Sequence, residues 1–176
     1  MTIPHESVAV LSRALDQAGD VLAVVHRDQL SQPTPCEDWT VEQLIAHLLA
    51  APGNFLRMMR GEAIDWSAEP PPVPEDFAAE FRSAADDLIH AWHQREQDAE
   101  TSADSQTPEF AVHTWDLARA TGQSTDLDPE VAERSLAFMS ANLKPEMRGE
   151  VFGPEVDLPD DAPIYDRLAA FAGRTP

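Results

Sequence analysis

The chain has 176 residues, of which 43% are hydrophobic and 25% charged, a balance typical of one ordinary globular domain and not of a disordered chain. Its formal net charge of −20 argues against binding to nucleic acid or to an anionic membrane surface, because both carry negative charge. We find neither a transmembrane segment nor a signal peptide, and the single cysteine excludes an internal disulfide, so the cytoplasm is the expected location.

Two amphipathic helices are predicted in the first third of the chain. Apolar residues recur at three- and four-residue spacing from about residue 5 to residue 30, which is the period of a helical stripe. A second helix is expected over about 40–61, where Thr40 followed by Gln43 matches a capping box. His47 lies among the leucines of the apolar face of this second helix.

A third helix is predicted from about Glu75 to Glu96, after a proline-rich connection over 62–75. The polar and acidic run 97–106 is expected to be a loop. This third helix carries a His-xx-His pair, His90 and His93. We interpret both as exposed or bonded to neighbours, and a surface zinc site is the alternative.

The fourth predicted helix, Pro108–Gly122, is the segment around which the chain is organised. Its first turn has a proline and a carboxylate, it stops at a glycine, and Thr107 is expected to be its N-cap. Glu109 and His113 are four residues apart, so their side chains lie on one helix face, about 5–6 Å apart at Cβ. They can therefore point at the same spot.

The remainder of the chain predicts short additions to these four helices. A fifth helix is expected over Pro129–Leu143, an extended segment over Val151–Leu158, and a last short helix over Pro163–Gly173. No internal repeat and no convincing run of strands is visible. The predicted fold class is therefore all-α, a four-helix bundle with short C-terminal additions, and residues 1–176 are predicted to form a single domain.

One constellation of residues predicts a metal site. Helical bundles build such sites in their core from facing helices, and His47 together with Glu109 and His113 makes a set of two imidazoles and one carboxylate. Three protein ligands with an open position suit catalytic zinc, and the same set suits ferrous iron. The alternative is that these are polar core residues, because Glu and His four residues apart are common on helices.

Other residues allow two interpretations each. Cys36 is expected to pack as a small hydrophobe, with a reactive thiol as the alternative. Asp116 either orients the imidazole three residues before it or forms a salt bridge with Arg119. Trp39 and Trp115 are interpreted as core anchors, with ligand stacking as the alternative.

Three sequence motifs carry a resemblance to a known family. They are PTPCEDWTVEQLIAHLL (Pro33–Leu49), VHTWDLARATGQ (Val112–Gln123) and APIYDRLAAFAGRTP (Ala162–Pro176). Together they resemble the mycothiol-dependent maleylpyruvate isomerase N-terminal-like metal-binding family of the DinB/YfiT-like superfamily, and in particular its short single-domain members. The resemblance implies a DinB-like four-helix bundle that holds a divalent metal, usually zinc, through His47, Glu109 and His113.

The resemblance also implies a function. The first hypothesis is a metal-dependent thiol transferase or isomerase in which zinc, or else Ni²⁺ or Fe²⁺, activates the thiol of a cosubstrate such as mycothiol for attack on an electrophile. The second is a metal- or ligand-binding protein without turnover, and the third is a relic whose site residues survive as polar core. Members of the superfamily often pair through bundle faces, which implies a homodimer in which the first helix offers a candidate surface.

Overall fold

The computed structural model describes residues 4–36, 38–95, 102–149 and 152–176. In these ranges the chain is helical, and no strand is present apart from one isolated bridge between Pro33 and Thr40. The predicted all-α fold class is confirmed. The α-helices are α1 (Pro4–Val24), α2 (Val41–Met59), α3 (Phe77–Gln94), α4 (Thr107–Ala120), α5 (Pro129–Asn142) and α6 (Ile164–Phe171), and the 3₁₀ turns are η1 (Arg27–Gln29), η2 (Ala103–Ser105) and η3 (Pro145–Met147).

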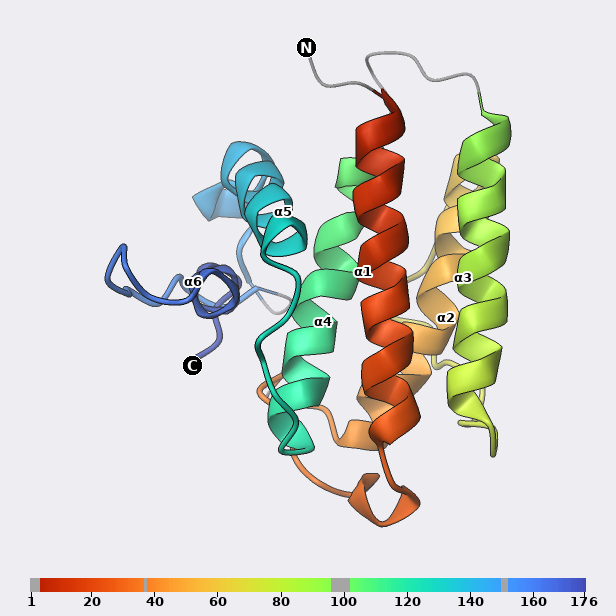
Figure 1. Cartoon of the computed structure of the whole chain (residues 1–176), viewed down its shortest axis with the longest axis horizontal. Coiled ribbons are helices and arrows are strands. Elements are labelled where there is room, and N and C mark those ends of the chain that lie inside the picture. The colour runs from red at the N-terminus through yellow and green to blue at the C-terminus, as the bar shows by residue number, and fades with distance from the viewer. Residues whose placement is uncertain (1–3, 37, 96–101, 150–151) are drawn as a thin grey trace.

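The first four helices lie side by side as a bundle, and the last two pack against one flank of it (Figure 1). α1 contacts α3 on one side and α4 on the other, and α2 completes the bundle by contacting both α3 and α4. α5 and α6 cover the side of α4 that the bundle leaves open. α4 is therefore enclosed by α1, α2, α5 and α6, which makes it the central helix of the molecule.

The apolar stripes predicted from the sequence form the core of the bundle. Each aliphatic side chain that is fully buried stabilises the folded chain by about 1.5–3 kcal/mol relative to an exposed one. On α1 the predicted stripe is buried throughout (Leu11, Leu15, Ala18, Leu22), and on α2 and α3 the same holds for Leu44, Ile45, Leu48, Phe81 and Leu88. Trp115 of α4 has no exposed surface, so the interpretation of this residue as a core anchor is confirmed.

Helix α1 is shorter than the sequence predicts. The apolar stripe continues to Val25, which is buried, but the helix ends at Val24. The backbone at His26 is extended, and its N–H donates a hydrogen bond of 2.9 Å to the side-chain oxygen of Gln29. This local bond begins η1 and replaces the helical bond that the stripe alone would predict.

The predicted N-cap of α4 is wrong. The helix begins at Thr107 itself, and Gln106 occupies the N-cap position. The hydroxyl of Thr107 donates to the carbonyl oxygen of Ala103 at 3.2 Å, so it points back into η2 instead of capping the following turn. η2 thus joins directly onto α4, a connection that the polar composition of the segment did not predict.

The segment after α5 follows a course fixed by α6. Residues 152–158 form neither helix nor strand, and Val151 lies outside the described residues. The N–H of Val156 donates to the carbonyl of Ala170 at 2.9 Å. Gly173, with φ of +90°, packs its Cα side against Gly153, where a Cβ would come within 2.8 Å of the Gly153 nitrogen. The end of the chain is therefore held closely against this segment.

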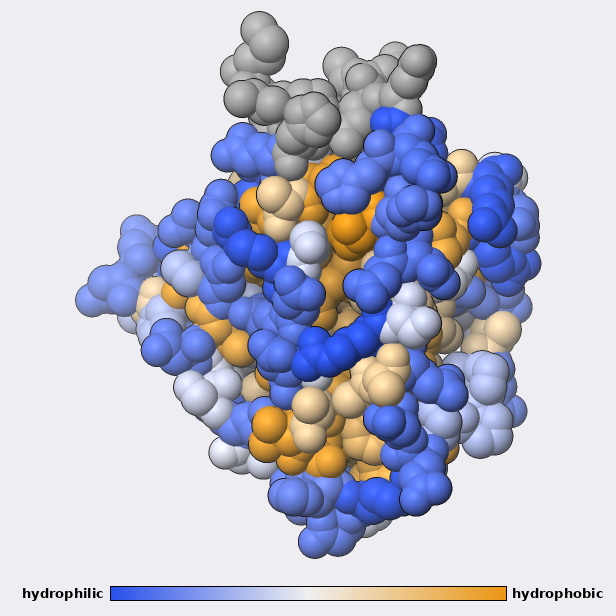
Figure 2. All heavy atoms as spheres, turned by 45° about the vertical axis from the view of Figure 1, so that its right-hand side comes forward, coloured by the Kyte–Doolittle hydropathy of each residue, from blue (hydrophilic) through white to orange (hydrophobic). Residues whose placement is uncertain are grey.

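The surface on the α3 side of the bundle is mostly hydrophilic, and apolar atoms show mainly along a seam and in a small patch (Figure 2). This distribution is what the amphipathic pattern of the helices predicts. None of the helices in the described ranges combines the length and the apolar character needed to span a membrane.

Candidate metal centre

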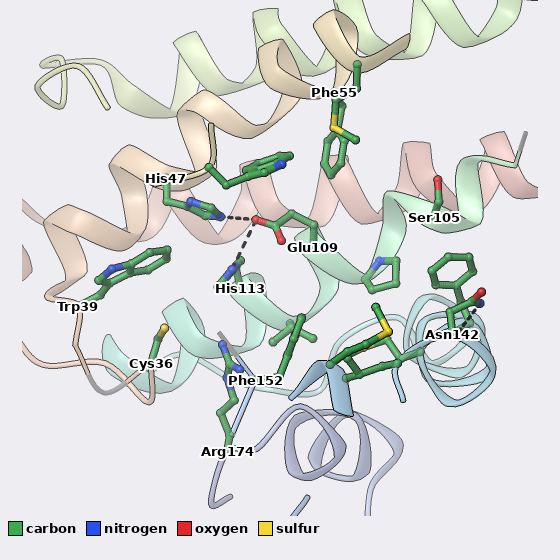
Figure 3. A pocket seen from close by; sticks show the side chains of 18 of the residues that line it. Cys36, Trp39, His47, Phe55, Ser105, Glu109, His113, Asn142, Phe152 and Arg174 are labelled. Carbon is green, nitrogen blue, oxygen red and sulfur yellow. Dashed lines mark hydrogen bonds and ion pairs between the residues drawn. The ribbon is translucent and has the colours of Figure 1, made fainter. Parts of the chain in front are cut away.

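Helix α4 carries two of the predicted ligands on one face. Glu109 lies in its first turn and His113 one turn later, so both side chains point toward α2 (Figure 3). Pro108 is tolerated at the start of the helix because the first-turn N–H groups have no partner within the helix. Because neighbouring helices cover α4 on several sides, the backbone that carries Glu109 and His113 is held rigidly.

Helix α2 supplies the third predicted ligand, and its capping box sets the register. The N–H of Gln43 donates to Thr40 Oγ1 at 3.3 Å, and the N–H of Thr40 donates to Gln43 Oε1 at 2.9 Å, so the predicted capping box is confirmed. Leu44 and Leu48 are fully buried on either side of His47. The imidazole of His47 is thereby turned toward α4.

The structure brings His47, Glu109 and His113 together. One ligand atom from each residue lies within 4.8 Å of the other two, an arrangement that could hold a metal ion. Glu109 Oε1 contacts His47 Nε2 in an ion pair and lies 3.5 Å from His113 Nε2 (Figure 3). All three side chains are largely buried, with between 11% and 24% of their side-chain surface exposed.

The electrostatics of this cluster favour the charged forms of Glu109 and His113. Burial alone would raise the pKa of Glu109, but the neighbouring imidazoles of His113 and His47 outweigh burial and lower this pKa to about 2. Burial would likewise lower the pKa of His113, yet the carboxylates of Glu109 and Asp116 raise it. The carboxylate of Glu109 therefore stays ionised beside the two imidazoles.

A buried carboxylate and a guanidinium stand behind His113. Asp116 Oδ2 lies 3.1 Å from His113 Nδ1, and the side chain of Asp116 is fully buried. Arg174 donates to both carboxylate oxygens of Asp116, from Nε at 3.1 Å and from Nη2 at 3.0 Å. Its Nη1 donates to the carbonyl of Ala172 at 2.8 Å. Of the two interpretations of Asp116, orientation of the imidazole is the one that the structure supports, whereas Arg119 lies over the ring of Trp115.

This arrangement fixes how His113 can act as a ligand. An ionised carboxylate only accepts hydrogen bonds, so the Nδ1 that faces Asp116 must carry the proton. In the neutral imidazole the lone pair then resides on Nε2, the atom that faces Glu109 and His47. A carboxylate that holds the far nitrogen of a ligand histidine is the usual partner of metal-binding imidazoles. The donor set therefore fits a divalent cation.

Two indole rings flank the imidazoles. The ring of Trp39 lies 4.7 Å from that of His47 and 5.7 Å from that of His113, centre to centre, and Trp66 lies 6.1 Å from His47. Trp39 is half-buried and packs against the hydrophobic core, as the core-anchor interpretation expects, and it also forms part of the cavity wall. The loop before α2 places it there, because Thr34 Oγ1 donates to the Trp39 carbonyl at 2.8 Å.

A cavity of about 540 Å³ opens beside the three predicted ligands. Its volume lies in the range of small-molecule sites. Most of its wall is apolar and comes from α2, α4, α5 and the segment before α6, for example Phe55, Val112, Phe138, Met139 and Phe152. The ligand cluster therefore faces a half-open cavity large enough for a small substrate.

Cys36 also lines this cavity, but its thiol stays protonated at neutral pH. Burial raises the pKa of Cys36 to about 11, which leaves very little thiolate at neutral pH. This agrees with the interpretation of Cys36 as a packing residue.

The remaining histidines and the missed residues complete the comparison with the sequence. His90 and His93 are both exposed on α3, as predicted, and the amide nitrogen of Gln94 lies 2.9 Å from His90 Nε2. Sequence reasoning missed Trp66, in the proline-rich connection, and Arg174, three residues from the C-terminal end. Arg174 follows Gly173 in the third motif, which is the only signal that could have drawn attention to it.

Comparisons with known proteins agree with this picture. The sequence model of the family described as the mycothiol maleylpyruvate isomerase N-terminal domain matches residues 11–125. Two proteins described as uncharacterised, from the CDC 1551 / Oshkosh and ATCC 25618 / H37Rv strains of Mycobacterium tuberculosis, are each 36% identical over 181 residues, which cover 93% of this chain and 94% of theirs. No solved structure matches the chain. The family match includes all three predicted ligands and ends before Arg174.

Proposed function

The chain belongs to the mycothiol maleylpyruvate isomerase N-terminal domain family, and from this premise we propose that it binds one divalent metal ion through His47, Glu109 and His113. We propose further that it is a thiol-dependent transferase or isomerase, whose cosubstrate is a low-molecular-weight thiol such as mycothiol. The observation that carries the proposal is the convergence of three ligand atoms within 4.8 Å in the wall of a substrate-sized cavity.

The ligand set favours zinc. Two imidazole nitrogens and one carboxylate oxygen are the ligands of many catalytic zinc sites, which keep a further position open, and Ni²⁺ or Fe²⁺ would accept the same set. A divalent cation bound there supplies a Lewis acid that lowers the pKa of a thiol. In this proposal the reacting thiol belongs to the cosubstrate. This accords with the raised pKa of Cys36, which keeps the protein's own thiol protonated.

The protein's own residues orient the ligands and shield them from water. Asp116 holds the Nδ1 proton of His113, and Arg174 holds Asp116, so that Nε2 stays directed at the metal position. Trp39 and Trp66 cover the imidazole of His47. In the proposed reaction the cosubstrate thiol loses its proton to solvent, and its sulfur adds to an electrophilic carbon of a carbon–carbon double bond, whose π electron pair takes up a proton from solvent at the neighbouring carbon. A transferase releases this adduct. An isomerase, after rotation about the former double bond, returns that proton to solvent and expels the thiolate, so that the double bond forms again.

We propose that residues 1–176 act as a single domain, because the end of the chain supports the proposed metal site. Arg174 follows α6, yet its guanidinium reaches Asp116 of α4, which lies within the family match. α5 and Phe152, in the segment before α6, also form part of the cavity wall. The C-terminal additions are therefore expected to be needed for function.

Metal analysis tests the first part of the proposal. Protein purified without chelators is expected to carry close to one metal ion per chain, and the metal-free form to take up one zinc ion. His47→Ala should abolish this uptake, whereas His90→Ala, which removes an exposed histidine of α3, should leave it unchanged. Failure of the unaltered protein to take up zinc would refute the metal proposal.

Thiol consumption tests the second part. Zinc-loaded protein mixed with mycothiol and an electrophile is expected to speed the loss of the electrophile, and the His47→Ala variant is expected not to. A protein that binds one zinc ion but accelerates no reaction with any thiol would be a metal-binding protein without turnover instead.

A further inference from the structure

The cavity beside the metal position has two unlike ends. At one end lie the imidazoles of His47 and His113 and the carboxylate of Glu109. Away from them the wall is mostly apolar, with side chains from α2, α5 and the segment before α6, and Ser105 and Asn142 are its neutral polar members. In Figure 3, Phe55 and Phe152 come from different elements and both face the space around Glu109. A substrate that places its reacting atom at the polar end must therefore put the rest of its body against apolar side chains.

The mouth of the cavity is apolar as well. Among the described residues, four large hydrophobic side chains are exposed to solvent, with exposures between 40% and 61%. Three of them, Met58, Trp66 and Met147, line this cavity, and only Val24 lies elsewhere. Exposed apolar side chains that gather at one place mark a binding site, and methionine adapts its shape to different partners.

The positive charge in the cavity wall, in contrast, is already paired with a carboxylate of the protein. In the part of the chain that the structure describes, Arg174 is the only lysine or arginine that lines the cavity. Its guanidinium forms a two-bond ion pair with Asp116, and the residue is 6% exposed.

The carboxylates of Asp38 and Glu109 also line the cavity, and the whole chain carries a net charge of −20. The imidazoles of His47 and His113 already contact Glu109. Among the described lining residues, an entering carboxylate thus meets no lysine or arginine that is free of an ion pair.

We propose that the substrate at this site is an uncharged electrophile with an apolar, aromatic or branched body, and not a dicarboxylate such as maleylpyruvate. The proposal rests on the proposed function for the place of the reacting atom and on the cavity wall for the remainder. A metal ion would compensate one carboxylate of a dicarboxylate at most. The second would be buried without a partner, which costs several kcal/mol and thus at least about 100-fold in affinity.

A matched pair of unreactive probes tests the proposal. Binding of 2-naphthalenemethanol and of naphthalene-2,3-dicarboxylate to the full chain is measured by titration calorimetry at pH 7.5, with and without zinc. Without zinc the neutral probe is expected to bind at least about 100-fold more tightly, and with zinc at least about tenfold. Equal or tighter binding of the dicarboxylate, or no binding of the neutral probe, would overturn the proposal.

Surface variants locate the binding and guard against nonspecific adsorption. Met147→Asp places a carboxylate at the mouth and should weaken binding of the neutral probe about tenfold, whereas Val24→Asp makes the same change away from the cavity and should not alter it. Asn142→Arg adds an unpaired cation to the wall and should strengthen dicarboxylate binding about tenfold. Equal effects of Met147→Asp and Val24→Asp would overturn the assignment to this cavity.

The two proposals fail separately. If the protein takes up zinc but binds neither probe, the metal proposal stands and the proposal of an apolar substrate is wrong. If it binds the neutral probe but takes up no zinc, the proposal of an apolar substrate-binding cavity stands and the metal proposal is wrong.

Discussion

Helices α3 and α4 carry the same kinds of polar side chain and make very different use of them. On α3 one stripe is buried, and His90 and His93 lie exposed on the opposite side. α4 is covered on several sides, so its histidine and its carboxylate face a neighbouring helix. Helical spacing brings residues together on both helices. Only on α4 does a second element, α2, bring a third group to the same place.

The comparison teaches that a candidate metal site depends on convergence and support from more than one element. His113 is bonded to Asp116 on its own helix and, through Asp116, to Arg174 at the far end of the chain. His90, in contrast, lies within hydrogen-bond distance of Gln94, one turn away on the same helix. The imidazole of His113 is therefore held in one orientation, whereas the exposed imidazole of His90 is free to adopt others.

The largest effect is expected from exchanging the histidines of the two helices for alanine. His113→Ala removes a proposed ligand and should lower zinc affinity by more than about 100-fold, because even loss of a residue that only orients a ligand costs 10- to 100-fold. His93→Ala should leave zinc affinity unchanged, because this residue is exposed on α3. Competition with a chromophoric chelator measures both, and equal affinities of the two variants would remove the distinction between the helices.

The next effect concerns thiol reactivity. With a pKa of about 11 in place of 9.0, Cys36 should react with iodoacetamide about 100-fold more slowly at pH 8 than an unperturbed thiol, because only the thiolate is nucleophilic. The rate should rise with pH until about 11.

A control cysteine makes this measurement specific. Ser83→Cys in a Cys36→Ser background places a thiol on the exposed side of α3 and should react at the ordinary rate. Equally fast alkylation of both thiols at pH 8 would show that Cys36, in the segment before α2, is as accessible to solvent as the surface of α3.

A smaller effect is expected from the residues behind His113. Asp116→Asn and Arg174→Gln should each lower metal affinity about 10- to 100-fold and alter the visible absorption spectrum of the cobalt-substituted protein, because His113 loses its fixed orientation. Arg174→Lys should restore part of the affinity, since it keeps the charge but not the two-bond geometry.

Arg148→Gln is the matched control for the end of the chain. Arg148 donates to the carbonyls of Gly153 and Phe171, both at 2.8 Å, and so holds the C-terminal segment without touching Asp116. The Arg148→Gln variant should lower the free energy of unfolding and leave the absorption spectrum of the cobalt-substituted protein unchanged. The same spectral change in both variants would mean that Arg174 acts only by holding the chain end in place.

The smallest effect is expected from two glycine substitutions compared by urea unfolding. Gly61→Ala should cost about 1–2 kcal/mol, because its φ of +84° is unfavourable for alanine but the space around it is open. Gly173→Ala should cost more than about 2 kcal/mol, because its Cβ would also meet the backbone of Gly153 at 2.8 Å. Equal losses in the free energy of unfolding would indicate that the segment around Gly173 can shift to accommodate the added Cβ without loss of stability.

Sequence alone was sufficient for the helices and for the three proposed ligands. The helical stripes, the capping box of Thr40 and the prolines and glycines at helix ends act within a few residues, so the chain order reveals them. The spacing of Glu109 and His113 likewise fixes their common face. His47 was added because it lies among the leucines of the second helix and because bundles build metal sites from facing helices, and the resemblance to a family then supported this choice.

Tertiary structure alone decided what surrounds these ligands. Asp116 and Arg174 are separated by 58 residues and meet only because α6 turns the end of the chain back onto α4. The start of α4 depended in the same way on a contact between Thr107 and η2. The apolar cavity forms because α5 and the segment before α6 close over one side of α4. Such contacts depend on which surfaces pack together after the helices have formed, and helical periodicity carries no information about that.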